Sequence, residues 1–165
     1  MTLKEFLSAQ KTITSAKLDW KDKKMSKTNS PFPLSKSRGL RLGTGWTWTV
    51  ITLTANGLSF RLLVSFHTGK ENYQAALGYV AGTDDTYVIG CLEYHGTHAG
   101  WHVHGCCEPP QKQNVGRMRY PDLKRLPNGK KKHRRIDFGV SQSNGLGPAV
   151  KFFKLQEALN NWTPI

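Results

Sequence analysis

Few cysteines, few acidic residues and no long hydrophobic run characterise this sequence of 165 residues. Its three cysteines are an odd number and two of them are adjacent, so they do not form a disulfide framework. No segment approaches the roughly 20 apolar residues that cross a bilayer, and residues 1–20 lack the apolar core of a signal peptide. These absences predict a reduced, cytoplasmic protein that does not bind membranes, and the length suits one domain.

The shortage of acidic residues leaves a large positive charge that is unevenly distributed. Lys and Arg total 24 against 11 Asp and Glu, which gives a net charge of +13. The net charge is +7 over residues 1–42, −3 over residues 43–111 and +9 over residues 112–135. This excess disfavours basic partners and favours a polyanion, nucleic acid first. A slightly acidic segment between two basic ones suits a metal or catalytic centre flanked by phosphate-binding surfaces.

Residue patterning predicts a basic, largely extended or disordered arm over residues 1–42 and an α+β domain over residues 43–165. The arm is rich in Lys, Ser and Thr and has no long apolar face. In the domain, β-branched and aromatic residues predict strands, and apolar residues at helical spacing predict helices. The expected strands cover residues 46–54, 58–66, 87–94, 101–107 and 136–140, and the expected helices cover residues 71–80 and 148–160. We therefore expect an antiparallel sheet with helices on one face, and a basic loop at residues 111–135.

Two histidines and a glutamate form the most informative group. His102 and His104 are two residues apart in an expected strand, so both point to the same face. If the chain turns back so that Tyr94 pairs with Trp101, Glu93 lies directly across from His102. A carboxylate and two imidazoles that converge from adjacent strands can hold a divalent metal ion. A shift of one residue in this register would send Glu93 to the opposite face.

Other roles for this group stay open. A pair of histidines in a strand is often an ordinary surface pair without a metal. Zn²⁺ is the alternative metal ion, with His102, His104 and a cysteine as ligands. The same register places Cys91 across from His104, while alternation puts Cys106 on the face of the histidines and Cys107 on the other face. Small buried cysteines without a ligand role are nonetheless common.

The segment GWHVHG, residues 100–105, resembles the His-hydrophobic-His motif of the HUH endonuclease superfamily. This superfamily includes rolling-circle replication initiators, plasmid relaxases and single-strand transposases. The strand VITLT, residues 50–54, is similar to the family's first motif, and Glu93 stands where many initiators place a third metal ligand. The resemblance covers residues 45–160. It implies a bacterial, phage or plasmid origin, and Mg²⁺ or Mn²⁺ held by Glu93, His102 and His104.

The resemblance also implies a reaction with single-stranded or hairpin DNA. In the family, the metal ion polarises a scissile phosphate, and a tyrosine on a late helix attacks it and stays joined to the 5′ phosphate. That tyrosine is often followed by a lysine in a Y-x-x-K pattern. Here Phe152 or Phe153 stands in the place of the tyrosine, with Lys154 after them, and Tyr120 is the one tyrosine after the histidines. A Tyr→Phe substitution, a natural loss of nicking and the use of Tyr120 are three accounts that the sequence does not separate.

Cationic residues are densest in the expected basic loop. Contacts of such groups with phosphates release counterions, so binding is expected to weaken steeply with salt. Tyr120 lies among them, and an aromatic ring among cations suits stacking with unpaired bases, although a solvated turn explains the same composition. The candidate nucleic-acid-binding residues are Arg117, Arg119, Lys124, Arg125, Lys130, Lys131, Lys132, Arg134 and Arg135.

Three hypotheses for the function follow. The first is a metal-dependent domain that binds single-stranded DNA, resembles rolling-circle replication initiators, and nicks DNA if a tyrosine nucleophile is available. The second is a non-catalytic, phage- or plasmid-encoded binding protein that reuses the HUH fold to regulate or inhibit a nucleic-acid-dependent complex. The third is a small nucleic-acid-binding protein stabilised by zinc. The sequence indicates no particular protein partner.

Overall fold

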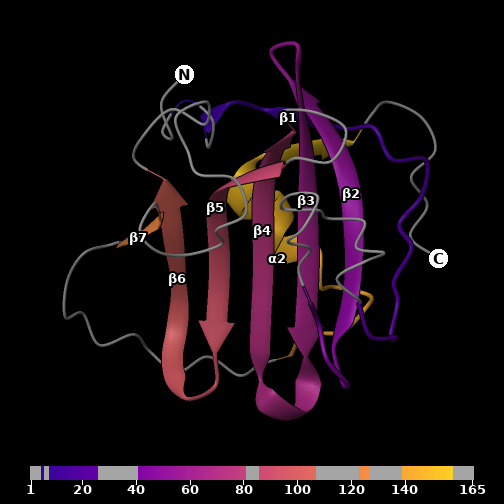
Figure 1. The fold of residues 1–165 in the computed structure, drawn as a ribbon, viewed down its shortest axis with the longest axis vertical. Helices are drawn as coiled ribbons and strands as arrows, with labels where there is room; N and C mark the ends of the chain where they lie inside the picture. The colour runs from indigo at the N-terminus through magenta and orange to yellow at the C-terminus, as the bar shows by residue number, and fades with distance from the viewer. Residues whose placement is uncertain are drawn as a thin grey trace.

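One mostly antiparallel sheet of eight strands forms the body of the protein in a computed structural model (Figure 1). The structure describes residues 5, 8–25, 41–80, 86–106, 123–126 and 139–157. Across the sheet the strands follow the order β7-β6-β5-β4-β3-β2-β1-β8. Every neighbouring pair is antiparallel except β1 and β8, which are parallel. Helix α2 lies behind this sheet in Figure 1, so the class is α+β.

The strands are short at the two edges of the sheet and long in its middle. Their bounds are Lys11–Ile13 (β1), Thr47–Ala55 (β2), Leu58–His67 (β3), Asn72–Val80 (β4), Thr86–His95 (β5), His98–Cys106 (β6), Leu123–Leu126 (β7) and Leu155–Glu157 (β8). Among the described residues the helical elements with defined bounds are the 3-10 turn η1 (Thr68–Lys70) and helix α2 (Gly147–Phe153). Four of the five expected strands are confirmed as β2, β3, β5 and β6, with ends shifted by up to three residues.

The hairpin of β2 and β3 follows directly from its turn residues. Asn56 and Gly57 have φ angles of 51° and 74°, the left-handed values that a tight two-residue hairpin turn requires. Ala55 therefore pairs with Leu58, and the pairing continues to Thr47 and Phe66 at the far end.

The expected helix over residues 71–80 is wrong, because this segment is the central strand β4. Tyr73, Ala75 and Leu77 point to one face of the sheet, Ala76 points to the other, and all four are at most 1% exposed. A strand that is covered on both faces loses the alternation of apolar and polar residues that marks a strand in sequence. Its apolar residues then also fit helical spacing, and periodicity alone does not separate the two structures.

The late helix is shorter than expected. Pro148 lies in its first turn as predicted, but α2 ends at Phe153 instead of continuing to residue 160. Lys154 has a left-handed φ of 52°, which turns the chain out of the helix. The following strand β8 then pairs in parallel with β1, and this pairing replaces the helical hydrogen bonds that the sequence pattern predicted.

Part of the expected N-terminal arm belongs to the sheet. Strand β1 lies between β2 and β8, and isolated bridges join Lys21 to Trp48 and Met25 to Leu42. Residues 26–40 are outside the described residues. The expected basic loop contains strand β7, a correction to the loop assignment, and Gly139 and Val140 are not in a strand although residues 136–140 were expected to form one.

The two faces of the sheet have different neighbours. The face toward α2 holds most of the hydrophobic core, in which Ile51, Leu62 and Leu77 pack with Phe153 of the helix, all four without exposed surface. The opposite face carries Cys91, Glu93 and His102, which alternate with core residues along β5 and β6. Among the described residues no helix is long and apolar enough to span a membrane.

Candidate metal centre on strands β5 and β6

The expected register of the β5–β6 hairpin is confirmed. Tyr94 pairs with Trp101, Glu93 with His102, and Cys91 with His104. Residues that are directly opposite in an antiparallel pair share a face and have Cβ atoms about 5 Å apart. The backbone pairing therefore brings a carboxylate and two imidazoles together.

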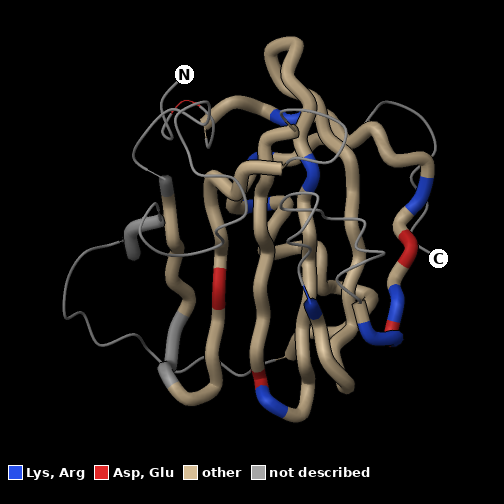
Figure 2. Tube along the Cα trace, viewed as in Figure 1, with Lys and Arg blue, Asp and Glu red and all other residues tan. Residues whose placement is uncertain are grey.

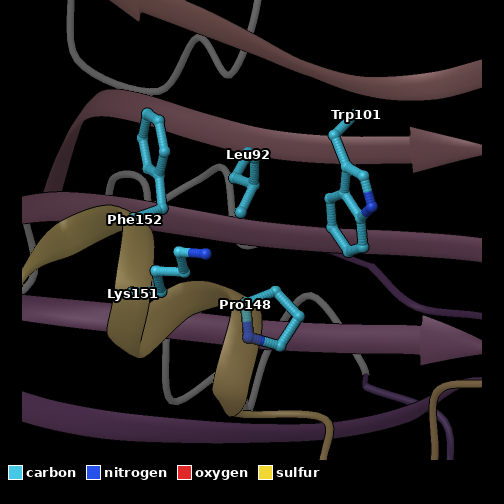
Figure 3. Close-up of a pocket in the computed structure, with 5 residues that line it drawn as sticks. All are labelled: Leu92, Trp101, Pro148, Lys151 and Phe152. Carbon is cyan, nitrogen blue, oxygen red and sulfur yellow. The ribbon is translucent and has the colours of Figure 1, made fainter. Parts of the chain in front are cut away.

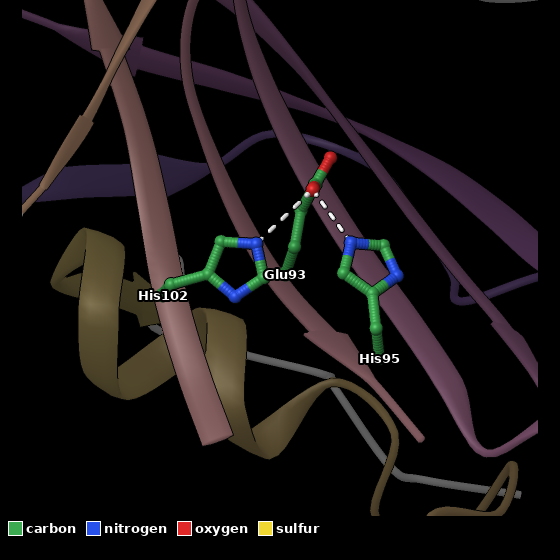
Figure 4. Close-up of side chains that lie close together, drawn as sticks. All are labelled: Glu93, His95 and His102. Atoms are coloured by element: carbon green, nitrogen blue, oxygen red, sulfur yellow. Dashed lines mark hydrogen bonds and ion pairs between the residues drawn. The ribbon is translucent and has the colours of Figure 1, made fainter. Parts of the chain in front are cut away.

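One carboxylate oxygen of Glu93 is the meeting point of three imidazole rings. Its Oε2 atom lies 3.0 Å from His95 Nε2, 3.5 Å from His102 Nε2 and 3.4 Å from His104 Nε2. Potential ligand atoms of Glu93, His95 and His102 lie within 4.8 Å of one another, and Figure 4 shows both rings turned toward the carboxylate. We call these four residues, Glu93, His95, His102 and His104, the Glu–His cluster.

His95 is the member of the Glu–His cluster that the sequence analysis missed. The expected strand ends at residue 94, but β5 continues to His95 and a register irregularity follows Tyr94. Its partner is then His98, and its ring centroid lies 5.1 Å from that of His102. The spacing of Glu93 and His95, two residues apart like His102 and His104, is the sequence signal that would have indicated a shared face.

The second carboxylate oxygen of Glu93 is held by neighbours on β4 and β5. Gln74 Nε2 donates a hydrogen bond to Oε1 over 3.2 Å, and Cys91 Sγ donates to the same atom over 3.4 Å. Hydrogen bonds to one oxygen orient a ligating carboxylate and leave the other oxygen directed at the metal position. Cys91 is 1% exposed and lies on the Oε1 side of the carboxylate, opposite the oxygen that faces the rings. The side chain of Cys106 and all of Cys107 lie outside the described residues.

Burial makes the Glu–His cluster costly unless its charges are compensated. The side chain of Glu93 is 1% exposed and that of His102 is 5% exposed, whereas His104 and His95 reach solvent at 20% and 27%. Glu93 is the acidic residue of β5, a strand that carries no Lys or Arg, and Figure 2 shows the red position on this strand. A buried carboxylate needs a cation or a dense set of hydrogen bonds. A carboxylate oxygen and several imidazole nitrogens can hold a divalent metal ion, which then has access to solvent past His95 and His104.

Helix α2 lies on the far side of the sheet from the Glu–His cluster. Leu92 and Trp101 line a cavity with Phe152 of the helix, and these two strand residues alternate with Glu93 and His102. Phe153 is fully buried in the core and Lys154 is exposed at the end of the helix. The proposed positions of a late-helix nucleophile, Phe152 and Phe153, are therefore separated from the cluster by the sheet.

Most of the expected nucleic-acid-binding residues lie outside the described residues, and so does Tyr120. Two of them, Lys124 and Arg125, belong to β7, the strand next to β6. In the pairing of these strands Arg125 is the partner of His104, and Lys124 is the partner of Gly105. The backbone pairing thus brings one basic residue, Arg125, to the position next to His104 of the Glu–His cluster. The remaining candidates, all outside the described residues, are Arg117, Arg119, Lys130, Lys131, Lys132, Arg134 and Arg135.

Comparisons with known proteins identify no relative of this chain. No protein-family model, no curated protein and no solved structure matches the chain. The function is therefore inferred from the geometry of the Glu–His cluster and from the charge of the chain.

Proposed function

We propose that this protein binds single-stranded or hairpin DNA through a divalent metal ion held by the Glu–His cluster, in the manner of an HUH domain. The observation that carries the proposal is the convergence of Glu93 Oε2 with three imidazole nitrogens at 3.0 to 3.5 Å. A bound divalent ion would supply a positive centre that attracts and polarises a phosphate oxygen. Mn²⁺, Mg²⁺ and Zn²⁺ are the candidate ions, and the imidazole-rich donor set favours Mn²⁺ or Zn²⁺ over Mg²⁺.

The residues around the Glu–His cluster support this role. Gln74 and Cys91 hold Glu93 Oε1, which keeps Oε2 directed at the histidines. Strand β7 places Arg125 opposite His104 of the cluster, and the chain has a net charge of +13. Phosphates that approach the metal ion would meet a basic environment, and the affinity for DNA should fall with salt.

Strand cleavage requires a nucleophile on the cluster face. Tyr73, Tyr79, Tyr87 and Tyr94, the tyrosines of the described residues, belong to the face toward α2. Tyr120 is the fifth tyrosine of the chain. If the protein nicks DNA, Tyr120 is the tyrosine that attacks the phosphate. If it does not nick DNA, it is a binding protein that uses the metal ion for recognition. The position of α2 favours this second, non-catalytic form.

Metal titration tests the first part of the proposal. We expect the protein, stripped with EDTA, to melt at a higher temperature with Mn²⁺ or Zn²⁺, because an ion that binds the folded state stabilises it. His102→Ala should abolish the shift, whereas the matched control His67→Ala, at the end of β3 and outside the cluster, should keep it. Equal shifts in the wild type and the His102→Ala variant would refute the proposed site.

A covalent-adduct assay tests the second part. The protein is incubated with labelled single-stranded DNA and Mn²⁺ and analysed by denaturing electrophoresis. A labelled protein band that disappears in Tyr120→Phe would identify an enzyme. DNA binding that depends on His102 and produces no adduct would identify the binding protein. A DNA affinity that is the same with and without the metal ion, and the same in His102→Ala as in the wild type, would contradict the proposal.

A further inference from the structure

An apolar cavity lies on the sheet face opposite the Glu–His cluster, between α2 and strands β5 and β6 (Figure 3). It has a volume of about 510 Å³ and is lined by Leu92, Trp101, Pro148, Lys151 and Phe152. Its size lies within the range of small-ligand sites. We propose that this cavity binds an unpaired base of a single-stranded nucleic acid, with the base against Trp101 and Phe152 and a phosphate at Lys151. The proposal rests on the proposed function for the class of partner, but it needs none of the metal-binding residues.

The two aromatic rings of the cavity are held in place from behind. The indole of Trp101 packs against Tyr73 and Tyr94, with ring centroids 5.0 Å and 5.5 Å away. Phe152 meets Phe153 edge to face at 4.9 Å, and Phe153 is fully buried. Trp101 and Phe152 themselves remain partly exposed. Rings that are fixed before binding lose little conformational entropy when a base stacks on them, and stacking tolerates any base.

The charge at the cavity favours an anionic ligand. Lys151 is exposed in the last turn of α2, and the neighbouring Lys154 is exposed as well. Within the described part of the chain no acidic residue lines the cavity, and the sequence has none between Gly147 and Lys154. A planar base can stack on the aromatic rings of Trp101 and Phe152 while its phosphate pairs with the ammonium group of Lys151. A fatty acid would also suit an apolar cavity with a lysine, but the net charge of +13 favours a polyanion.

Fluorescence anisotropy with a labelled oligothymidylate, in EDTA to remove metal ions, tests the proposal. Phe152→Ala should weaken binding about tenfold through the loss of stacking. Lys151→Gln should lower the slope of log K against log salt by about 0.7, because one phosphate contact is lost. The matched control Lys70→Gln, at an exposed lysine of η1 between β3 and β4, should change neither quantity. Circular dichroism melting verifies that each variant is folded, and Lys151 is exposed, so its replacement leaves the core intact.

Each outcome of this experiment supports or overturns the cavity proposal. Wild-type affinity and salt slope in both Phe152→Ala and Lys151→Gln would overturn it, as would an absence of oligothymidylate binding. Competition by thymidine monophosphate as effective as that by the oligonucleotide would make a free nucleotide the ligand instead of a strand. Displacement of an apolar dye by oleate but not by the oligonucleotide would make the cavity a fatty-acid site. Metal binding by the Glu–His cluster is tested separately, by the metal-induced melting shift that His102→Ala should abolish.

Discussion

Lys11 is a lysine buried in the core, and its titration gives the sharpest test of this structure. It has no exposed surface, and its Nζ atom donates hydrogen bonds to Ala9 O at 2.8 Å and to Phe153 O at 3.0 Å. Phe153 is the last residue of α2, so the amine also lies at the negative end of the helix dipole. Burial, with a smaller contribution from the charge of Lys154, lowers the pKa of Lys11 from 10.5 to about 8.

The lowered pKa sets the direction and size of the pH effect. Between about pH 8 and 10.5 the unfolded chain holds a proton on Lys11 that the folded protein has released. The free energy of unfolding therefore rises with pH in this window and is independent of this group below it. From pH 7 to pH 9 the gain should be about 1 kcal/mol. Burial raises the pKa of Tyr73 above its usual value of 10, so Tyr73 opposes stability only at higher pH.

Urea denaturation of the wild type and Lys11→Met at pH 7, 8 and 9 measures this effect. The difference in unfolding free energy between the two proteins should shift by about 1 kcal/mol in favour of the wild type as the pH rises. Other titrating groups are common to both proteins and cancel in that difference. Lys70→Met, which replaces an exposed lysine, should show no such shift. Parallel curves for the wild type and Lys11→Met would refute the burial of a titrating amine at this position.

Three further predictions follow from individual contacts. His95→Ala should weaken Mn²⁺ or Zn²⁺ binding at least tenfold in isothermal titration calorimetry, and unchanged affinity would exclude His95 from the centre. Phe153→Ala should lower the free energy of unfolding by about 3–5 kcal/mol in urea, because it leaves a cavity in the core; a loss below about 1 kcal/mol would contradict that packing. Gly145→Ala should cost about 1–3 kcal/mol, since a Cβ atom there would lie 2.7 Å from Ser141 O. Gly43→Ala, with open space around it, serves as its control in the same denaturation experiment, and equal stability of the two variants would contradict the close approach.

The expected register of the β5–β6 hairpin came from the ends of the two expected strands, Tyr94 and Trp101. The side-chain period of two in a strand places His102 and His104 on one face. The expected pairing of Tyr94 with Trp101 then sets Glu93 against His102, and the structure confirms that pairing. The same reasoning failed for β4, where burial on both faces removes the alternation on which the prediction depends.

The register beside His95 and the end of α2 depended on contacts that no local pattern encodes. The irregularity after Tyr94 shifts the register between the turn, where His95 pairs with His98, and the rest of the hairpin, where Glu93 pairs with His102. The end of α2 at Phe153 results from the parallel pairing of β8 with β1, two segments far apart in the chain. The residues around position 155 do not indicate that this segment pairs with the strand near residue 12.

The sequence by itself determined the charge of the chain and the two-residue spacing that puts His102 and His104 on one face of a strand. These properties are local, because they follow from side-chain chemistry and strand periodicity. The tertiary structure alone decided that His95 and His104 both reach the same carboxylate oxygen and that α2 packs on the other face of the sheet. The face on which α2 packs depends on which apolar surfaces bury one another across the whole fold, and it separates the Glu–His cluster from the aromatic cavity.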